Sequence, residues 1–117
     1  MARGEGARRQ EVGARTVAVC HLGNIARYNI KTGTWHRLPN EGLDGPVYAL
    51  LVHKDNLYVG GSFNTITNGF SDLGNIVRLD LKTNKWHRLP NSGFDSTVYT
   101  LAGKGNDVYI GGYFENT

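Results

Sequence analysis

The chain has 117 residues, and its 16 glycines are about twice the usual share, which disfavours a helical bundle. With 39% hydrophobic and 20% charged residues, it is neither collagen-like, nor a charged disordered chain, nor a membrane protein, so we expect a folded, soluble domain. The net charge is +3, and most of it lies in the first 21 residues. The remainder is near neutral and predicts no nucleic-acid partner and no anionic membrane surface.

Residues 1–21 are interpreted as a poorly ordered basic leader. Four arginines there face only Glu5 and Glu11. The longest apolar stretch, residues 17–20, is too short for a signal peptide, and we expect no membrane span in this chain. Cys20 is the single cysteine of the sequence, which excludes an intrachain disulfide.

Residues 22–117 form a second region, which matches itself at a shift of 51 residues. The two copies are residues 23–66 and 74–117, and 21 of their 44 aligned positions are identical. The longest identical run is Trp-His-Arg-Leu-Pro-Asn, which starts at Trp35 and again at Trp86. A period near 50 residues is typical of propeller blades and is too long for the common helical repeats.

Each period contains the signals of four short strands. Apolar runs at 47–52 and 57–61 flank a turn, and a second pair at 75–81 and 85–89 flanks residues 82–84, so two tight hairpins are predicted. The first pair lacks polar alternation, which predicts that neighbouring sheets bury both of its faces. A β-sandwich is the structural alternative, but it does not account for a near-identical repeat.

The repeated motifs resemble the kelch repeat. Its second half is matched by Tyr28-Asn29, Trp35 and Leu38-Pro39, and again by Leu79-Asp80, Trp86 and Leu89-Pro90. Its first half, an apolar strand that ends in two glycines, is matched at Gly60-Gly61 and Gly111-Gly112. Two departures are the replacement of Tyr-Asp by Tyr28-Asn29 and Leu79-Asp80, and the lack of the arginine that usually follows Leu-Pro.

This resemblance covers residues 22–117 and extends to the galactose-oxidase-like propellers. The Gly-Ser-Phe that begins at Gly61 is more narrowly similar to fungal cell-surface propellers that mark cell polarity. The resemblance implies an all-β propeller built from four-stranded antiparallel blades. The signature residues then have structural roles: Gly60, Gly61, Gly111 and Gly112 allow close approach of the backbone, and Trp35 and Trp86 fill the gap between sheets.

The strands add up to about two blades, with half a blade at each end of the region. Known propellers close with about four to eight blades, so we expect a fragment of a longer propeller. The alternative is that the first half-blade, residues 23–38, pairs with the last half-blade, residues 98–114, of another chain. Three chains would then form a six-bladed homo-oligomer.

The longer connections, residues 39–46, 62–74 and 90–97, are expected on one face of the blades. Polar loops on a rigid scaffold are where binding residues usually lie. The candidate binding residues are Leu43, Asp44, Asn64, Asn68, Phe70, Asp72, Phe94 and Asp95. The alternative is that they are ordinary turn residues. The repeated His36 and His87 lie too far apart around a ring to share a metal ion, so no metal and no cofactor are predicted.

The expected function is that of a non-catalytic scaffold that binds another protein through this loop face. Copper chemistry of the galactose-oxidase type needs tyrosine and histidine ligands and a cysteine cross-linked to tyrosine. Because Cys20 lies outside the repeats, that site is not carried over, and no catalytic residue is predicted. The alternatives are a carbohydrate-binding or galactose-oxidase-like propeller, and a purely structural part of a larger ring.

Overall fold

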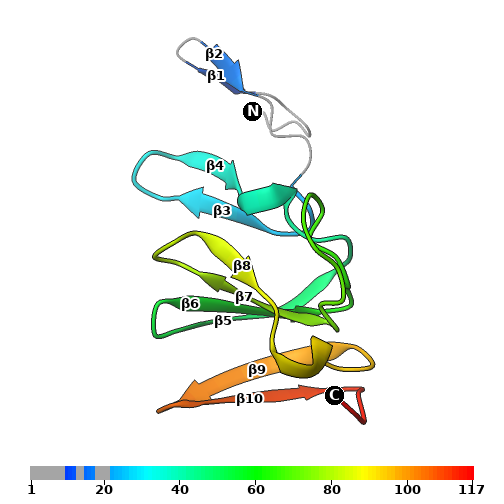
Figure 1. The fold of residues 1–117 in the computed structure, drawn as a ribbon. Helices are drawn as coiled ribbons and strands as arrows, with labels where there is room; N and C mark the ends of the chain where they lie inside the picture. Colours follow the sequence, from blue (N-terminus) through cyan, green and yellow to red (C-terminus); the bar gives the residue numbers. More distant parts are fainter. Residues whose placement is uncertain (1–9, 13–14, 18–21) are drawn as a thin grey trace.

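Antiparallel β-strands make up nearly all the regular structure in the computed structural model, which describes residues 10–12, 15–17 and 22–117 (Figure 1). The strands are β1 (Gln10–Val12), β2 (Arg15–Val17), β3 (Ala26–Asn29), β4 (Thr34–Arg37), β5 (Val47–His53), β6 (Asn56–Gly61), β7 (Ile76–Asp80), β8 (Lys85–His87), β9 (Val98–Lys104) and β10 (Asp107–Gly112). Two 3-10 turns, η1 (Pro39–Glu41) and η2 (Pro90–Ser92), are the only helical segments in this part of the chain. Neither of these is a candidate for crossing a membrane.

The centre of the fold is a four-stranded sheet in the order β5-β6-β7-β8, formed by the four strands expected between residues 47 and 89. β5 and β6 are joined by Lys54 and Asp55, whose φ angles of 52° and 64° are those of a two-residue type I′ hairpin turn. β8 ends at His87, two residues earlier than expected. The chain leaves the sheet there to begin η2 at Pro90, a residue without a backbone N–H for a further ladder bond.

The two half-sheets predicted at the ends of the repeat region are present as two-stranded sheets, β3-β4 and β9-β10. The turn after β3 and the turn after β7 are closed in the same way. Oδ1 of Asn29 accepts hydrogen bonds from the N–H groups of Lys31 and Thr32 at 2.9 and 3.0 Å. In the second copy, Oδ1 of Asp80 accepts hydrogen bonds from the N–H groups of Lys82 and Thr83. Asparagine and aspartate are therefore interchangeable at this position because both supply a side-chain oxygen.

β1 and β2 pair only with each other in the described structure. The remaining residues of the leader, 1–9, 13–14 and 18–21, lie outside the described residues, and Cys20 is among them. The predicted disorder of the leader therefore stays a prediction.

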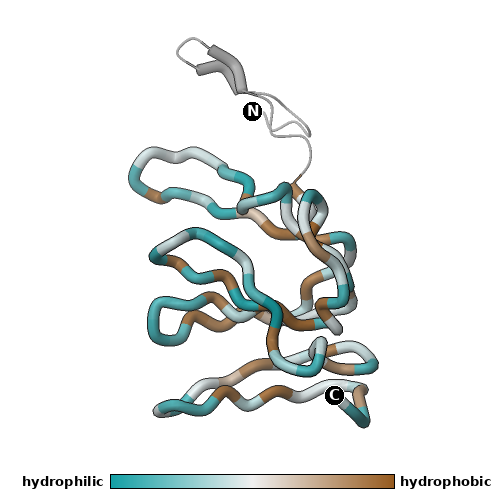
Figure 2. The backbone as a smooth tube through the Cα atoms, viewed as in Figure 1, coloured by the Kyte–Doolittle hydropathy of each residue, from teal (hydrophilic) through white to brown (hydrophobic). Residues whose placement is uncertain are grey.

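The sheets stack on one another, as Figure 1 shows. β9 packs against β5 and β6, and the β3-β4 pair lies over the opposite face of the central sheet. Ile25 and Leu38, which flank that pair, share one hydrophobic cluster with Leu79 and Trp86 of the central sheet. Figure 2 shows that the hairpin turns between β5 and β6 and between β9 and β10 are hydrophilic, whereas apolar residues recur along the strands that stack.

Close stacking requires glycine at Gly60 of β6. A Cβ atom at this position would lie 2.4 Å from Cγ1 of Val98, so any larger residue would push β9 away from the sheet. Val98 and Ile76 beside it are fully buried. The second part of the glycine pair, Gly61, approaches the backbone oxygen of Pro46 in a similar way.

The expectation that both faces of β5 are buried is wrong for the described chain. One face is covered by β9, but Leu50 and Val52 on the other face are 56% and 66% exposed. The physical reason is that, among the described residues, β3 and β4 are the strands that pack on this side of the central sheet. They cover β7 and β8 but leave the outer part of β5 open.

Candidate binding surface

The long connections lie together at one edge of the stacked sheets, opposite the short hairpin turns (Figure 1). We call this the long-loop edge and define it as residues 39–46, 62–75, 90–97 and 113–117. It is the arrangement expected from the strand directions, because in an antiparallel meander every second connection falls on the same side. All eight candidate binding residues belong to these segments.

Asp44 ties two of these loops together. Its Oδ1 accepts the backbone N–H groups of Asn64 and Thr65 at 2.9 and 3.1 Å, and its own N–H donates to the oxygen of Thr65. Asp44 therefore holds the start of the 62–75 loop against the 39–46 loop. The side chain is exposed, but one of its oxygens is already engaged within the chain.

Asp95 plays the same role one repeat later. Its Oδ1 accepts the N–H groups of Glu115 and Asn116 at 3.0 and 3.3 Å. These two backbone hydrogen bonds, that of Glu115 first, hold the pKa of Asp95 below its ordinary value of 3.8, because they stabilise the charged carboxylate. Asp95 fixes the chain after β10 as Asp44 fixes the chain after β6.

Asparagines supply the remaining loop contacts. Nδ2 of Asn40 donates to the backbone oxygen of Asn68 at 2.6 Å, and the N–H of Asn68 donates to the backbone oxygen of Asn40 at 2.9 Å. Oδ1 of Asn64 accepts the N–H of Gly74 at 3.3 Å, which fixes the end of the 62–75 loop. The loop is thus bound at its start, its tip and its end.

Phe70 and Arg88 form a contact that the sequence patterns did not indicate. The guanidinium carbon of Arg88 lies 5.2 Å from the centroid of the Phe70 ring, a cation–π distance. Nη1 of Arg88 also donates to the backbone oxygen of Ser71 at 3.2 Å. Arg88 stands in the repeated Trp-His-Arg run, but its equivalent Arg37 pairs with Glu41 instead, so the repeat alone could not reveal this contact.

The other candidates divide into buried and outward-facing residues. Leu43 is 1% exposed and belongs to the core, so its side chain contributes no surface. Its repeat equivalent Phe94 stacks on Phe114 with the ring centroids 3.9 Å apart.

Asn68 and Asp72 are exposed, and within the described structure no hydrogen bond or salt bridge engages their side-chain atoms. These two residues point out of an otherwise fixed loop.

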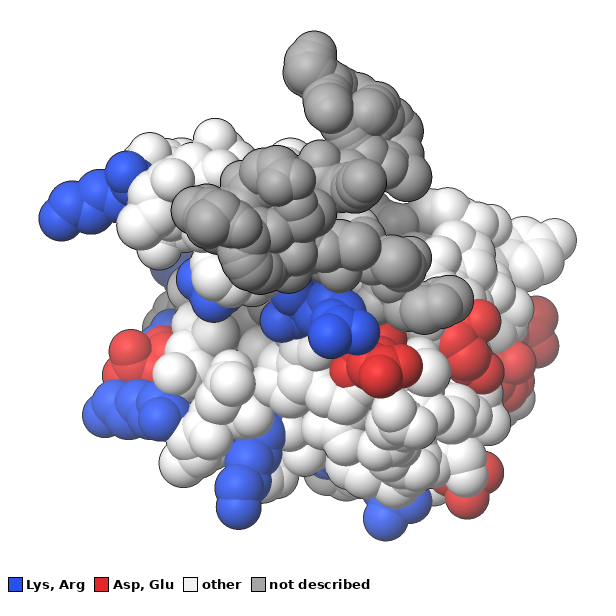
Figure 3. All heavy atoms as spheres, turned by 90° about the horizontal axis from the view of Figure 1, so that it is seen from above, with Lys and Arg blue, Asp and Glu red and all other residues white. Residues whose placement is uncertain are grey.

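The long-loop edge is acidic. It carries Glu41, Asp44, Asp72, Asp95 and Glu115, which are five of the eight acidic residues after residue 21. In the space-filling view from above, most of the visible acidic side chains gather on the right, which is the side of the long-loop edge (Figure 3). The edge therefore offers a negative potential to a partner.

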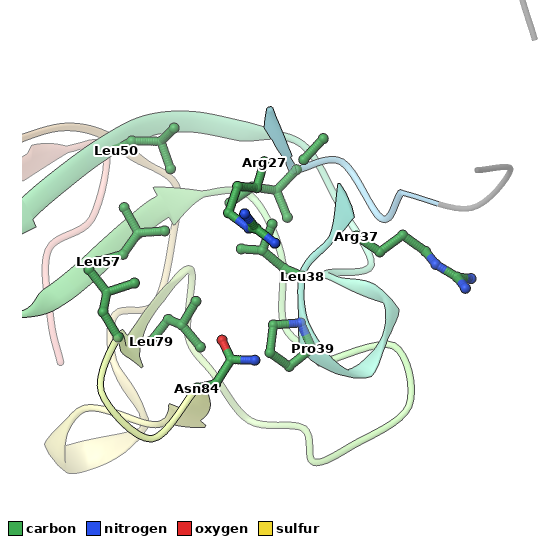
Figure 4. Close-up of a pocket in the computed structure, with 11 residues that line it drawn as sticks. Arg27, Arg37, Leu38, Pro39, Leu50, Leu57, Leu79 and Asn84 are labelled. Atoms are coloured by element: carbon green, nitrogen blue, oxygen red, sulfur yellow. The ribbon is translucent and has the colours of Figure 1, made fainter. Parts of the chain in front are cut away.

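A cavity of about 220 Å³ lies elsewhere, between the β3-β4 pair and the open face of the central sheet. Figure 4 shows Arg27 and Leu38 on one side of this space and the leucine side chains Leu50, Leu57 and Leu79 on the other. The repeat pattern did not predict this cavity, because no motif lines it: the cavity lies where, in the described residues, the β3-β4 pair covers only part of the central sheet.

Metal-ligand groups do not gather in the described part of the chain: no three His, Cys, Asp or Glu side chains come together there. His36 shares a hydrogen bond of 2.9 Å with Thr34 on the same strand. No protein-family model matches the chain, and the searches of curated proteins and of solved structures gave no significant match.

Proposed function

We propose that this chain is a kelch-like β-propeller segment that acts as a non-catalytic scaffold and binds another protein through its long-loop edge. The observation that carries the proposal is the fixed 62–75 loop. The side chains of Asn40, Asp44 and Asn64 form hydrogen bonds that hold the loop in place. Asn68 and Asp72 are exposed on this loop. A loop fixed in advance loses little conformational entropy on binding, which favours affinity.

The acidic character of the edge supports a partner with basic side chains. Glu41, Asp44 and Asp72 lie on the two loops that are tied together. Complementary charge at such a rim raises the rate of association and makes it depend on salt. A small molecule or a carbohydrate accounts less directly for acidic residues spread along an open edge, because the polar groups that bind small molecules are usually enclosed in a concave pocket.

The test is site-specific photocrosslinking in an extract of the source cells. A photoreactive residue replaces Asn68 at the long-loop edge, and the matched control replaces Thr83, which is exposed in the hairpin turn after β7 at the opposite edge. We expect a discrete protein adduct from position 68 that weakens with added salt and with Asp72→Lys. Equal adducts from both positions, or none from position 68, would contradict the proposal.

A further inference from the structure

Two strands of the described structure, β3 and β10, have a partner on one side where their repeat equivalents have partners on both sides. β3 pairs with β4 alone, and β10 pairs with β9 alone. Their repeat equivalents, β7 and β6, pair with each other in the central sheet. An open strand edge is a template for pairing with another chain. The pairing of β6 with β7 therefore shows the geometry in which β10 could pair with β3.

The shift of 51 residues transfers this pairing to the two open edges. In the central sheet Leu57 stands opposite Leu79, and Val59 stands opposite Val77. The same register would place Val108 opposite Tyr28, and Ile110 opposite Ala26. β10 and β3 cannot meet in this way within one chain, because the central sheet lies between them (Figure 1).

Charge favours this register. In the central sheet Arg78 and Tyr58 are opposite each other, and Nη1 of Arg78 donates to Oδ1 of Asn56 at 2.9 Å. The equivalent of Arg78 is Arg27, and the equivalent of Asn56 is Asp107. A neutral hydrogen bond inside the chain would thus become a charge-assisted one between Arg27 and Asp107, which is the stronger type.

The apolar faces at the two ends are complementary in the same sense. Stacking of β9-β10 on the outer side of the next chain's β5 would cover Leu50 and Val52 and fill the cavity beneath β3-β4. The face that β9-β10 would present carries Tyr109, which is exposed in the single chain. Covering exposed apolar side chains on both partners is the main driving force for such a contact.

Trp35 would also gain, at this contact, the hydrogen bond that its repeat equivalent Trp86 already makes. Trp86 is 6% exposed, and its Nε1 donates to the backbone oxygen of Pro39 on the preceding pair of strands at 2.8 Å. The equivalent Trp35 is 55% exposed and rests on Tyr28. With a second copy in place, Trp35 would reach the backbone oxygen of Pro90 of that copy.

We propose that copies of this chain associate head to tail, with β10 of one copy pairing antiparallel with β3 of the next and completing a four-stranded sheet. The contact joins two different surfaces, so repeated copies form either a closed ring or an open row. The proposal depends on the pairing inside the chain and not on what the long-loop edge binds.

The test reverses the charge pair and measures the mass of the chain by light scattering at low and high concentration. The wild type should exceed its monomer mass of 12.9 kDa as the concentration rises. Arg27→Asp or Asp107→Arg places like charges at the contact and should weaken association about tenfold at low salt. The double variant restores opposite charges, keeps the net charge of the wild type, and should associate normally.

Mixing the two single variants shows whether the contact lies between chains. Each contact between unlike chains then has opposite charges, so the mixture should associate as the wild type does, although each variant alone associates more weakly. Circular dichroism checks folding, and if a reversal unfolds the chain, Arg27→Ala and Asp107→Ala replace it and must still weaken association.

Three results would overturn the proposal. A folded wild type that keeps its monomer mass at high concentration would mean that β10 and β3 of two copies do not pair, and that their open edges pair only with repeats outside this chain. An assembly that neither reversal weakens would have formed through another surface. Single variants whose association is not restored when they are mixed would show that Arg27 and Asp107 do not meet.

Discussion

Trp35 and Trp86 occupy the same position in the two copies but different environments, and phenylalanine substitutions should separate them. Trp86→Phe removes the hydrogen bond to Pro39, a net loss of about 1 kcal/mol. The smaller ring also leaves less apolar surface buried, which adds about 1–2 kcal/mol. Trp35 is more than half exposed, and Phe retains its contact with Tyr28, so Trp35→Phe should change stability by less than about 0.5 kcal/mol.

The assay is urea unfolding followed by circular dichroism, at a protein concentration low enough to keep the chains apart. With an m-value of about 1–1.5 kcal/mol/M, Trp86→Phe should lower the unfolding midpoint by about 2 M, and Trp35→Phe should leave it nearly unchanged. Each variant keeps one tryptophan, whose emission reports its own exposure. Equal shifts of the midpoint would refute the reasoning, because they would mean that the two indoles are buried alike.

Three further predictions concern the loops and the stacking. Asp95→Asn should lower the melting temperature at neutral pH but not at strongly acid pH, because the carboxylate with a lowered pKa stabilises the fold above its ordinary 3.8 and this contribution is lost as the pH falls through the lowered pKa. Gly60→Ala should cost about 1–3 kcal/mol in denaturant unfolding through its clash with Val98, whereas Gly105→Asn, with open space around it and a φ that asparagine tolerates, should cost little. Asp44→Ala should speed amide hydrogen exchange at Asn64 and Thr65 while exchange within the central sheet stays slow.

The strands could be predicted from the sequence because their signals are local. A two-residue turn at Lys54 and Asp55 closes one hairpin, and the side-chain oxygen of Asp80 closes the next. Both signals recur, in varied form, at a fixed shift, so the order of the central sheet and the common edge of the long loops follow from them.

The candidate site could be predicted only in part, because its contacts join residues far apart in the chain. An aspartate in a polar loop, such as Asp44, is a typical candidate for binding a partner, yet the Asp44 side chain accepts a hydrogen bond that holds the loop at Asn64. The contact between Arg88 and Phe70 spans the loop and the following hairpin, and no spacing rule connects these residue types. The apolar run of β5 also gives no sign of whether a neighbouring sheet is present, so the sequence alone does not predict the exposure of Leu50.

The number of interfaces per copy links this exposure to the proposed association. Stability in stacked repeats is approximately the sum of what each repeat contributes and what each interface between neighbours contributes. One chain holds two copies but a single interface between them, the one that buries Trp86 and pairs β6 with β7. Every head-to-tail contact adds another interface of that type without adding a copy, so a closed ring doubles the interfaces per chain. The stability of this chain should therefore rise with its concentration, as it does for any protein whose native state is the one that associates.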